Sequence, residues 1–249
     1  MAVKTKRNSI YIIYEGYREG YFLEYLEKYS NVRLNQVPCN GGNSNSIVIN
    51  GIKHSERDIK VYVLFDEDFE SKPEHKILDD TLEGLAKKWK LDKDALKRCP
   101  YNQLQTENHN MRNPILIISN PQSLEGLLLR LLGYQKERLE GKSTKQLKQM
   151  LEGILGNVKL NNEDIQNIES YDKKIALYKE EIDRQKQKQD TPNFKEHCCF
   201  LKSRIRDYER RKNKVVFIRF LFDKLPLPVI ITKRNEVPEV DTLLNAFGL

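Results

Sequence analysis

Three apolar runs in the first half of the chain constrain its fold more than any other feature of the sequence. They read IYIIY at residues 10–14, IKVYVLFDEDF at 59–69 and PILIISNP at 114–121. The apolar part of each is rich in β-branched residues and lacks in-and-out alternation, which predicts strands covered on both faces. Segments with helical spacing separate the runs, and this order predicts βαβ units and a mainly parallel sheet in an α/β fold.

The segments around these runs complete the expected α/β domain, which spans residues 1–134. Residues 17–29 place tyrosine, phenylalanine and leucine side chains on one side of a helix. The remaining expected elements are a weaker strand at 32–38, helices at 47–54, 82–91 and 124–132, and a loop at 98–113.

The sequence changes character in residues 135–214, where strand signals disappear and apolar residues recur at steps of three and four. The turn-forming segment KQKQDTPN divides this pattern in two. We therefore expect two antiparallel helices, an α-helical hairpin inserted in the α/β domain. Residues 215–249 are expected to pack back on that domain, with a strand-like run at 229–232 and a short terminal helix. The apolar positions of the two helices are Ile165, Ile168, Tyr171, Ile175, Tyr178 and Ile182, then Phe194, Cys198, Leu201, Ile205 and Tyr208.

The excess of positive charge is concentrated in the expected hairpin. The net charge of the chain is +7, and residues 135–214 contain 20 Lys and Arg against 14 Asp and Glu. This distribution favours a polyanionic partner such as DNA or RNA, although a run of charges is also typical of a solvated helix face. The apolar seam of the hairpin could also pair two copies of the chain, so a homodimer stays open.

Membrane and export signals are missing from the sequence. No segment approaches the roughly 18 consecutive apolar residues of a membrane span, and the N-terminus lacks the apolar stretch of a secretory signal. The cysteines at positions 39, 99, 198 and 199 fit no CxxC zinc spacing. We therefore expect reduced thiols, a cytoplasmic location and no membrane partner. His197 leaves a metal site conceivable, but Cys198 and Cys199 are explained more simply as small core residues on a helix.

Acidic residues follow each of the three apolar runs. Glu15 comes directly after the first, and Glu19 lies one helical turn further on. Asp66 and Asp68 end the second run, and their spacing directs both side chains to the same side. Glu125 lies one turn into the helix that follows the third. Because ligands of an open parallel sheet bind outside the carboxyl ends of its strands, we expect these acids at one edge of the sheet.

A cluster of carboxylates predicts a cation site. Neighbouring carboxylates repel one another unless protons or cations neutralise them. Hard divalent ions such as Mg²⁺ prefer oxygen ligands, and two such ions can stabilise the attacking and leaving oxygens of a phosphoryl transfer. Any single acid is also explained as a loop residue or a helix N-cap, so the prediction rests on the group. Glu67 is expected to face solvent.

Three segments resemble motifs of a known family. EGYRE (15–19) is similar to the EGxxE element of Toprim domains in the overcoming-lysogenization-defect (OLD) nuclease group, and LFDEDF (64–69) to their DxD element. IISNPQSLEGLLL (117–129) resembles a segment of RloB-like proteins, with its acid four rather than three residues after the proline. The resemblance implies a Rossmann-like Toprim domain and Mg²⁺- or Mn²⁺-dependent cleavage of nucleic acid. It also implies a role in antiviral defence against phage, often beside an ATPase partner protein.

The resemblance also implies roles for individual residues. Related nucleases use a lysine late in the domain, for which Lys233, after the strand-like VIIT, is the first candidate and Arg234 the second. The implied metal ligands are Glu15, Glu19, Asp66, Asp68 and Glu125. The implied catalytic residues are Glu15, Asp66, Asp68 and Lys233.

Two other interpretations compete with the nuclease. A haloacid-dehalogenase-like phosphatase also has a strand followed by DxD and a later lysine, and would form an aspartyl phosphate on Asp66. That class needs Thr or Val where Glu70 stands, and it leaves Glu15 and Glu19 without a role. The second alternative is a non-catalytic subunit that binds nucleic acid or a partner protein. A topoisomerase is disfavoured, because nothing indicates a separate domain that carries a nucleophilic tyrosine.

Overall fold

The computed structural model of the chain describes residues 9–39, 44–55, 60–66, 76–88, 90, 97–99, 103–105, 115–120, 123–187 and 194–249. The chain divides into two compact units. The first, Met1–Gly153 with Lys224–Leu249, contains the sheet, and we call it the α/β unit. The second, Ile154–Asp223, is helical, and we call it the hairpin unit.

The sheet of the α/β unit has six strands in the order β2-β1-β3-β6-β5-β4. β2, β1, β3 and β6 run parallel, whereas β5 and β4 are antiparallel additions at one edge. The expectation of an α/β fold with a mainly parallel sheet is confirmed, and the arrangement is compatible with a Rossmann-like fold. The strands are β1 Ser9–Tyr14, β2 Arg33–Pro38, β3 Lys60–Asp66, β4 Lys97–Cys99, β5 Gln103–Gln105 and β6 Ile115–Asn120.

The three apolar runs became β1, β3 and β6, but β4 and β5 were not predicted. We expected a loop over residues 98–113. β5 lies within this segment, and β4 begins one residue before it. Each has three residues, too few to show a period of two in the sequence. Their pairing depends on the edge of β6, where Gln103 is level with Leu116, and a sequence pattern does not reveal that edge.

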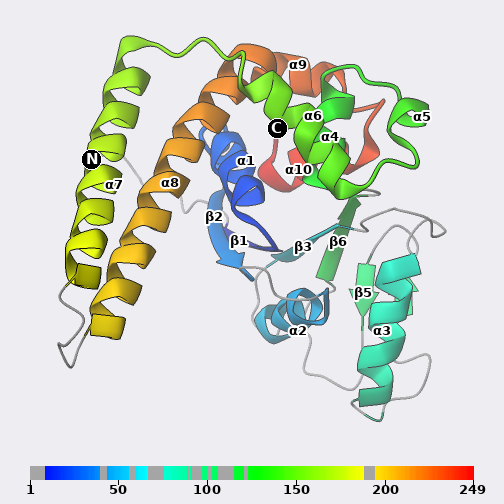
Figure 1. The fold of residues 1–249 in the computed structure, drawn as a ribbon. Helices are drawn as coiled ribbons and strands as arrows, with labels where there is room; N and C mark the ends of the chain where they lie inside the picture. The colour runs from blue at the N-terminus through cyan, green and yellow to red at the C-terminus, as the bar shows by residue number, and fades with distance from the viewer. Residues whose placement is uncertain are drawn as a thin grey trace, which may run out of the picture. The chain divides into compact units, whose positions relative to one another are not determined.

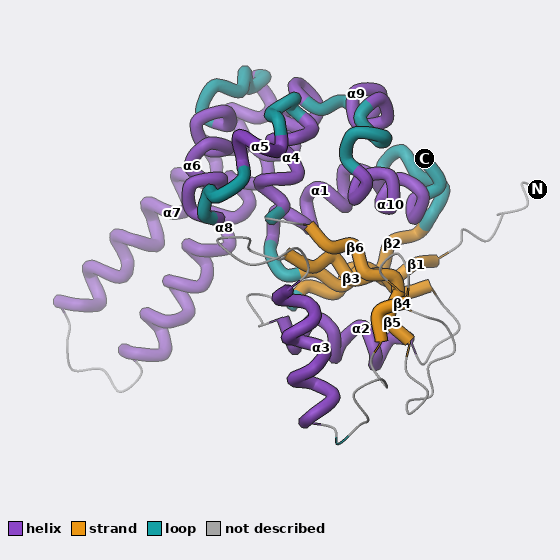
Figure 2. The backbone as a smooth tube through the Cα atoms, turned by 90° about the vertical axis from the view of Figure 1, so that its right-hand side faces the viewer, coloured by secondary structure: helices purple, strands orange, loops and turns teal. Residues whose placement is uncertain are grey.

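Helices cover both faces of the sheet (Figure 1). α2 (Ser44–Ser55) and α3 (Lys76–Lys88) lie on one face, and α1 (Tyr17–Glu27), α4 (Leu124–Leu131) and α10 (Pro238–Phe247) lie on the other (Figure 2). β1 is buried on both sides, since neither Ile12 nor Ile13 has any exposed surface. Ile13 belongs to the core cluster formed with α2 and α3. This double cover is why the run IYIIY lacks polar alternation.

The C-terminal part of the chain corrects one prediction. Residues 229–232 were expected to form a strand, but they lie in helix α9, Leu227–Thr232. Pro226 is its N-cap residue and Pro228 lies in its first turn, where a fixed φ favours a helix start. Ile230 is fully buried. The burial of one helical face therefore outweighs the β-propensity of the sequence VIIT.

The expected hairpin is present, with boundaries that differ from 135–214. Its helices are α7, Asn162–Gln187, and α8, Phe194–Lys224, so α8 continues beyond residue 214. The short helix α5 (Lys136–Leu139) and most of α6 (Thr144–Leu155) belong to the α/β unit instead. A weak change of pattern at residue 135 therefore marked the end of α4, not the border between the units.

Contacts along the seam establish that α7 and α8 are antiparallel. Ile182 packs with Cys198 and Leu201 near the turn between the helices. Further from the turn, Lys212 contacts Asp172 at 2.9 Å. Cys198 is thus a core residue, as expected, whereas the same expectation was wrong for Cys199, which is exposed. Among the described helices, none is long and apolar enough to cross a membrane.

Candidate functional site at the carboxyl edge of the sheet

The strand order creates a topological switch point between β1 and β3. From β1 the chain crosses through α1 to β2 on one side, and from β2 it crosses through α2 to β3 on the other side of β1. Such a switch point is the usual ligand site of an open α/β sheet. Ile13 and Val63 are paired in parallel register, and Glu15 and Asp66 follow them by two and three positions. Both acids therefore lie at the carboxyl edge of neighbouring strands.

Gly16 determines where the Glu19 carboxylate lies. Gly16 is the N-cap residue of α1, in an extended conformation with φ −112° and ψ 176°. A Cβ atom at this position would lie 2.6 Å from Oε2 of Glu19. The conformation itself suits any residue, so it is the close approach of the carboxylate that requires glycine here. Glu19, the third residue of α1, is consequently folded back over the helix start and is buried.

The second glycine of EGYREG has a similar steric role. A Cβ on Gly20 would lie 2.7 Å from the hydroxyl oxygen of Tyr14. That hydroxyl donates a hydrogen bond of 2.6 Å to Oε1 of Gln36 on the neighbouring strand β2. Burial raises the pKa of Tyr14 to about 12, and the nearby charges of Glu24 and Glu19 add to the effect. The motif therefore packs α1 closely against the ends of β1 and β2.

The carboxylate of Glu19 has a strongly raised pKa. Desolvation by burial raises its pKa to about 7, and the charges of Glu125 and Glu15 act in the same direction. A backbone hydrogen bond and the charge of Lys148 on α6 oppose this rise. Glu15 and Glu125 are thus close enough to Glu19 for their charges to act on it. A carboxylate in such surroundings is stabilised by an added cation.

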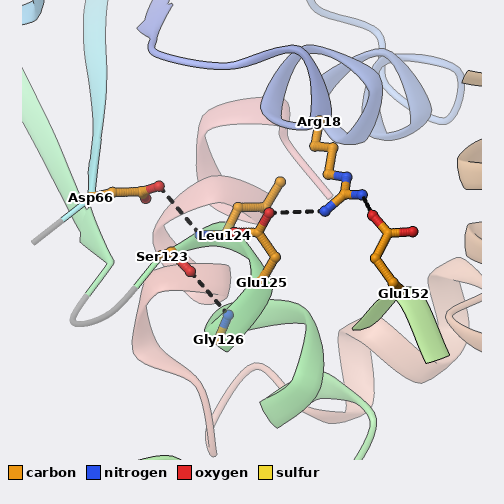
Figure 3. A network of polar contacts seen from close by, with 7 residues as sticks. All are labelled: Arg18, Asp66, Ser123, Leu124, Glu125, Gly126 and Glu152. Atoms are coloured by element: carbon orange, nitrogen blue, oxygen red, sulfur yellow. Dashed lines mark hydrogen bonds and ion pairs between the residues drawn. The ribbon is translucent and has the colours of Figure 1, made fainter. Parts of the chain in front are cut away.

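Helix α4 brings the third strand end into the site. Its N-cap residue Ser123 accepts a hydrogen bond from the backbone N–H of Gly126. The backbone N–H of Leu124 donates to Oδ2 of Asp66 at 3.4 Å, so this carboxylate faces the positive end of α4 (Figure 3). Glu125 follows in the first turn and is only 5% exposed. Asp66 and Glu125 therefore both lie at the start of α4 although they are distant in the sequence.

Arg18 links Glu125 to a third helix. Its Nη1 donates to Oε1 of Glu125 at 3.0 Å, and its Nη2 pairs with Glu152 on α6 (Figure 3). The motif resemblance assigned no role to this residue. A signal existed, because Arg18 is the basic residue within EGYRE, next to Glu19 in the sequence. Its partners could not be read from the sequence, since Glu125 is 107 residues away.

Two of the sequence candidates, Lys233 and Arg234, pair with other acids. Asp68 and its neighbour Glu67 lie outside the described residues. Lys233 caps the C-terminus of α9 and contacts Glu236 at 2.6 Å. It lines a pocket of about 250 Å³ whose described lining includes Arg130 and Tyr134 but neither Glu19 nor Glu125. Arg234 pairs with Asp241 instead.

The acidic side chains of this group are suitable ligands for a hard cation, but the described ones do not form a complete metal site. Within the described part of the chain, no three His, Cys, Asp or Glu side chains are arranged so that they could hold a metal ion together. The acids present are nevertheless oxygen donors of the type that Mg²⁺ and Mn²⁺ prefer. Glu19 in particular is a carboxylate whose pKa is raised first by burial and then by the neighbouring charges of Glu125 and Glu15. The described acidic residues are therefore chemically suited to bind a divalent cation.

A scan against protein-family models, a search of curated proteins and a search of solved structures each gave no match for this chain.

Proposed function

We propose that this chain is a divalent-metal-dependent nuclease of the Toprim type, which hydrolyses phosphodiester bonds in DNA or RNA, with tRNA among the RNA candidates. The observation that carries the proposal is the group of acids at the carboxyl edge of β1 and β3. Glu15 and Asp66 lie at two neighbouring strand ends, Glu19 lies in the first turn of α1, and Glu125 joins them from the start of α4. A conventional salt-bridge network would not leave Glu19 buried beside two further carboxylates.

Glu15, Glu19, Asp66 and Glu125 would hold Mg²⁺ or Mn²⁺, together with Asp68 by motif. When bound, the cations would supply charge stabilisation at the scissile phosphate and a more acidic water. The chain supplies the setting for this chemistry. Gly16 lets the Glu19 carboxylate lie against the start of α1, and burial strengthens every electrostatic interaction there. The backbone N–H of Leu124 orients Asp66.

The hairpin unit supports nucleic acid as the partner. Three cations on α8, Lys195, Lys202 and Arg206, are exposed and make no ion pair within the described residues. Their steps of seven and four place them on one stripe of the helix. An unpaired basic stripe binds phosphates without reading sequence. The proposed role as a toxic effector of phage defence, with an ATPase partner, rests on the motif resemblance alone.

The test is cleavage by the purified full chain, supplied with Mg²⁺ or Mn²⁺, against a panel of duplex DNA, single-stranded DNA, RNA and tRNA. We expect Glu15→Gln and Asp66→Asn to abolish cleavage, since both remove proposed ligands. The loss should exceed the roughly 10- to 100-fold that substitution of an outer-sphere partner typically costs. Circular dichroism should show that both variants keep the fold.

Glu140→Gln is the matched control for these variants. Glu140 is exposed at the end of α5, and the substitution makes the same change of charge in the α/β unit. It should leave cleavage unchanged. Full activity of Glu15→Gln or Asp66→Asn, or of the wild-type chain in excess EDTA, would refute the proposed function.

One observation favours a second candidate, a non-catalytic subunit that binds nucleic acid or a partner protein. Arg18 already neutralises Glu125 at 3.0 Å, so part of the acid group has a counter-ion within the chain. For such a subunit, the wild-type chain would bind nucleic acid yet cleave no member of the panel. Binding would then be the same in EDTA and in Mn²⁺, whereas the nuclease proposal expects cations to strengthen it.

A further inference from the structure

Arg18 lies between a buried and an exposed carboxylate. Glu125 is almost fully buried, whereas the side chain of Glu152 is 57% exposed. The Arg18 side chain itself is 27% exposed, so solvent reaches part of the guanidinium. A guanidinium has five N–H donors, and these two pairings use Nη1 and Nη2 once each. Donors of Arg18 are thus available on the side of the site that solvent reaches.

A cation held by Glu125 would compete with Arg18 for the same carboxylate. Oε1 of Glu125 accepts the hydrogen bond from Nη1, and a divalent ion on this carboxylate would bring three positive charges together. At a separation of about 4 Å, a unit charge and a divalent charge repel one another by roughly twice the interaction of two unit charges. The guanidinium would therefore leave Glu125 for another anion. Glu152, in water and on a separate helix, would still hold it near the site.

We propose that Arg18 is the substrate-binding residue of this site, which exchanges Glu125 for an oxygen of the substrate phosphate when a divalent cation occupies the acids. The inference rests on the proposed nuclease function and adds to it a residue that no motif assigned. The planar guanidinium matches the geometry of a phosphate and can donate two parallel hydrogen bonds to it. Its place on the first turn of α1, between Glu15 and Glu19, puts it next to the proposed ligands.

The exchange predicts opposite effects on two affinities. Arg18→Gln removes the competitor at Glu125, so the affinity for Mn²⁺ should rise by roughly 3- to 30-fold. The same substitution removes a charge-assisted hydrogen bond to phosphate, so the affinity for nucleic acid should fall by roughly 10- to 100-fold. Mn²⁺ affinity is measured by titration calorimetry. Nucleic-acid affinity is measured by fluorescence anisotropy of a labelled oligonucleotide in saturating Ca²⁺, to limit cleavage.

Two further variants separate this role from a structural one. Arg18→Lys keeps the charge without the planar fork, so Mn²⁺ affinity should stay within about twofold of the wild type while nucleic-acid affinity falls. Arg33→Gln is the control for charge. Arg33 is exposed at the amino end of β2, at the opposite edge of the sheet from the acids, and its substitution should change neither affinity at the acid site by more than about twofold.

The outcomes distinguish this inference from the proposed function. If the wild-type chain binds no Mn²⁺, the proposed function fails and the inference fails with it. If the wild type binds Mn²⁺ through Glu15 but Arg18→Gln leaves either affinity unchanged, or shifts both in one direction, the inference is overturned and the nuclease proposal stands. If Arg18→Gln does not fold, Arg18→Lys decides: equal nucleic-acid affinity to the wild type overturns the inference.

Discussion

Gly16 and Glu19 show how one residue type fixes the position of another. The carboxylate of Glu19 lies where the side chain of any other residue at position 16 would be. The backbone of Gly16 is extended and unstrained for an L-residue. A substitution there should therefore disturb the position of Glu19 and not the course of the chain.

Gly16→Ala should reduce cleavage by about 100-fold or more while lowering the stability of the fold by less than about 2 kcal/mol, since misplacement of a catalytic group by about 1 Å can have such a kinetic effect. Gly84→Ala is the matched control, because a Cβ on Gly84 in the exposed face of α3 would meet no atom within 4 Å. It should leave cleavage unchanged and stabilise α3 slightly. Wild-type activity of Gly16→Ala would show that cleavage does not depend on the observed position of the Glu19 carboxylate.

The raised pKa of Glu19 makes stability depend on pH. Its pKa in the folded chain is about 7 instead of the ordinary 4.5, because burial disfavours the charge. The folded state therefore binds the extra proton between these values, and the stability present below about pH 4.5 is lost as the pH rises through 7. The loss over this whole range amounts to somewhat more than about 3 kcal/mol in the free energy of unfolding, most of it between pH 5 and pH 8.

Glu19→Gln cannot lose a proton and should escape this loss. We expect the free energy of unfolding of Glu19→Gln, relative to the wild type, to increase by about 2–3 kcal/mol between pH 5 and pH 8. Urea unfolding followed by circular dichroism at several pH values measures the difference without added metal. A difference that is independent of pH would mean that Glu19 titrates normally in the folded chain.

Among the elements, α7 and α8 combine a packed seam with two kinds of surface cation. Lys212, Arg184 and Lys186 are paired with acids, such as Asp172 for Lys212. The stripe of Lys195, Lys202 and Arg206 is not paired within the described residues. Cations that are paired within the hairpin have less charge available for a ligand, so we expect the unpaired stripe to contact phosphates.

Replacement of the three stripe cations by Gln should weaken nucleic-acid binding and its dependence on salt. The slope of the logarithm of affinity against the logarithm of salt should flatten by roughly 2 to 3, which corresponds to three lost phosphate contacts. The control variant replaces Arg184, Lys186 and Lys212 by Gln, with the same change in net charge, and should flatten the slope less. A wild-type affinity that does not change with salt would indicate a protein partner for the hairpin.

At the scale of the molecule, the sheet order gathers residues from distant parts of the sequence. The β2-β1-β3-β6 order brings the ends of β1, β3 and β6 to one edge, and α1 and α4 start at that edge. The two units also differ in the number of chain segments that form them. The hairpin unit is one segment, whereas the α/β unit is completed by Lys224–Leu249 after the hairpin. Within that segment, α10 packs against β6 and α1.

The sequence alone determined the long parallel strands, the helices around them and the hairpin, because apolar periodicity over many residues reports burial directly. It also indicated the acids at the strand ends, since parallel strands place these positions at one edge. Only the tertiary structure decided the short edge strands and the helical state of Leu227–Thr232, where burial overrides local propensity. It alone brought Arg18 between Glu125 and Glu152, because a contact between residues so distant in the chain depends on how the helices pack, and no local pattern records that.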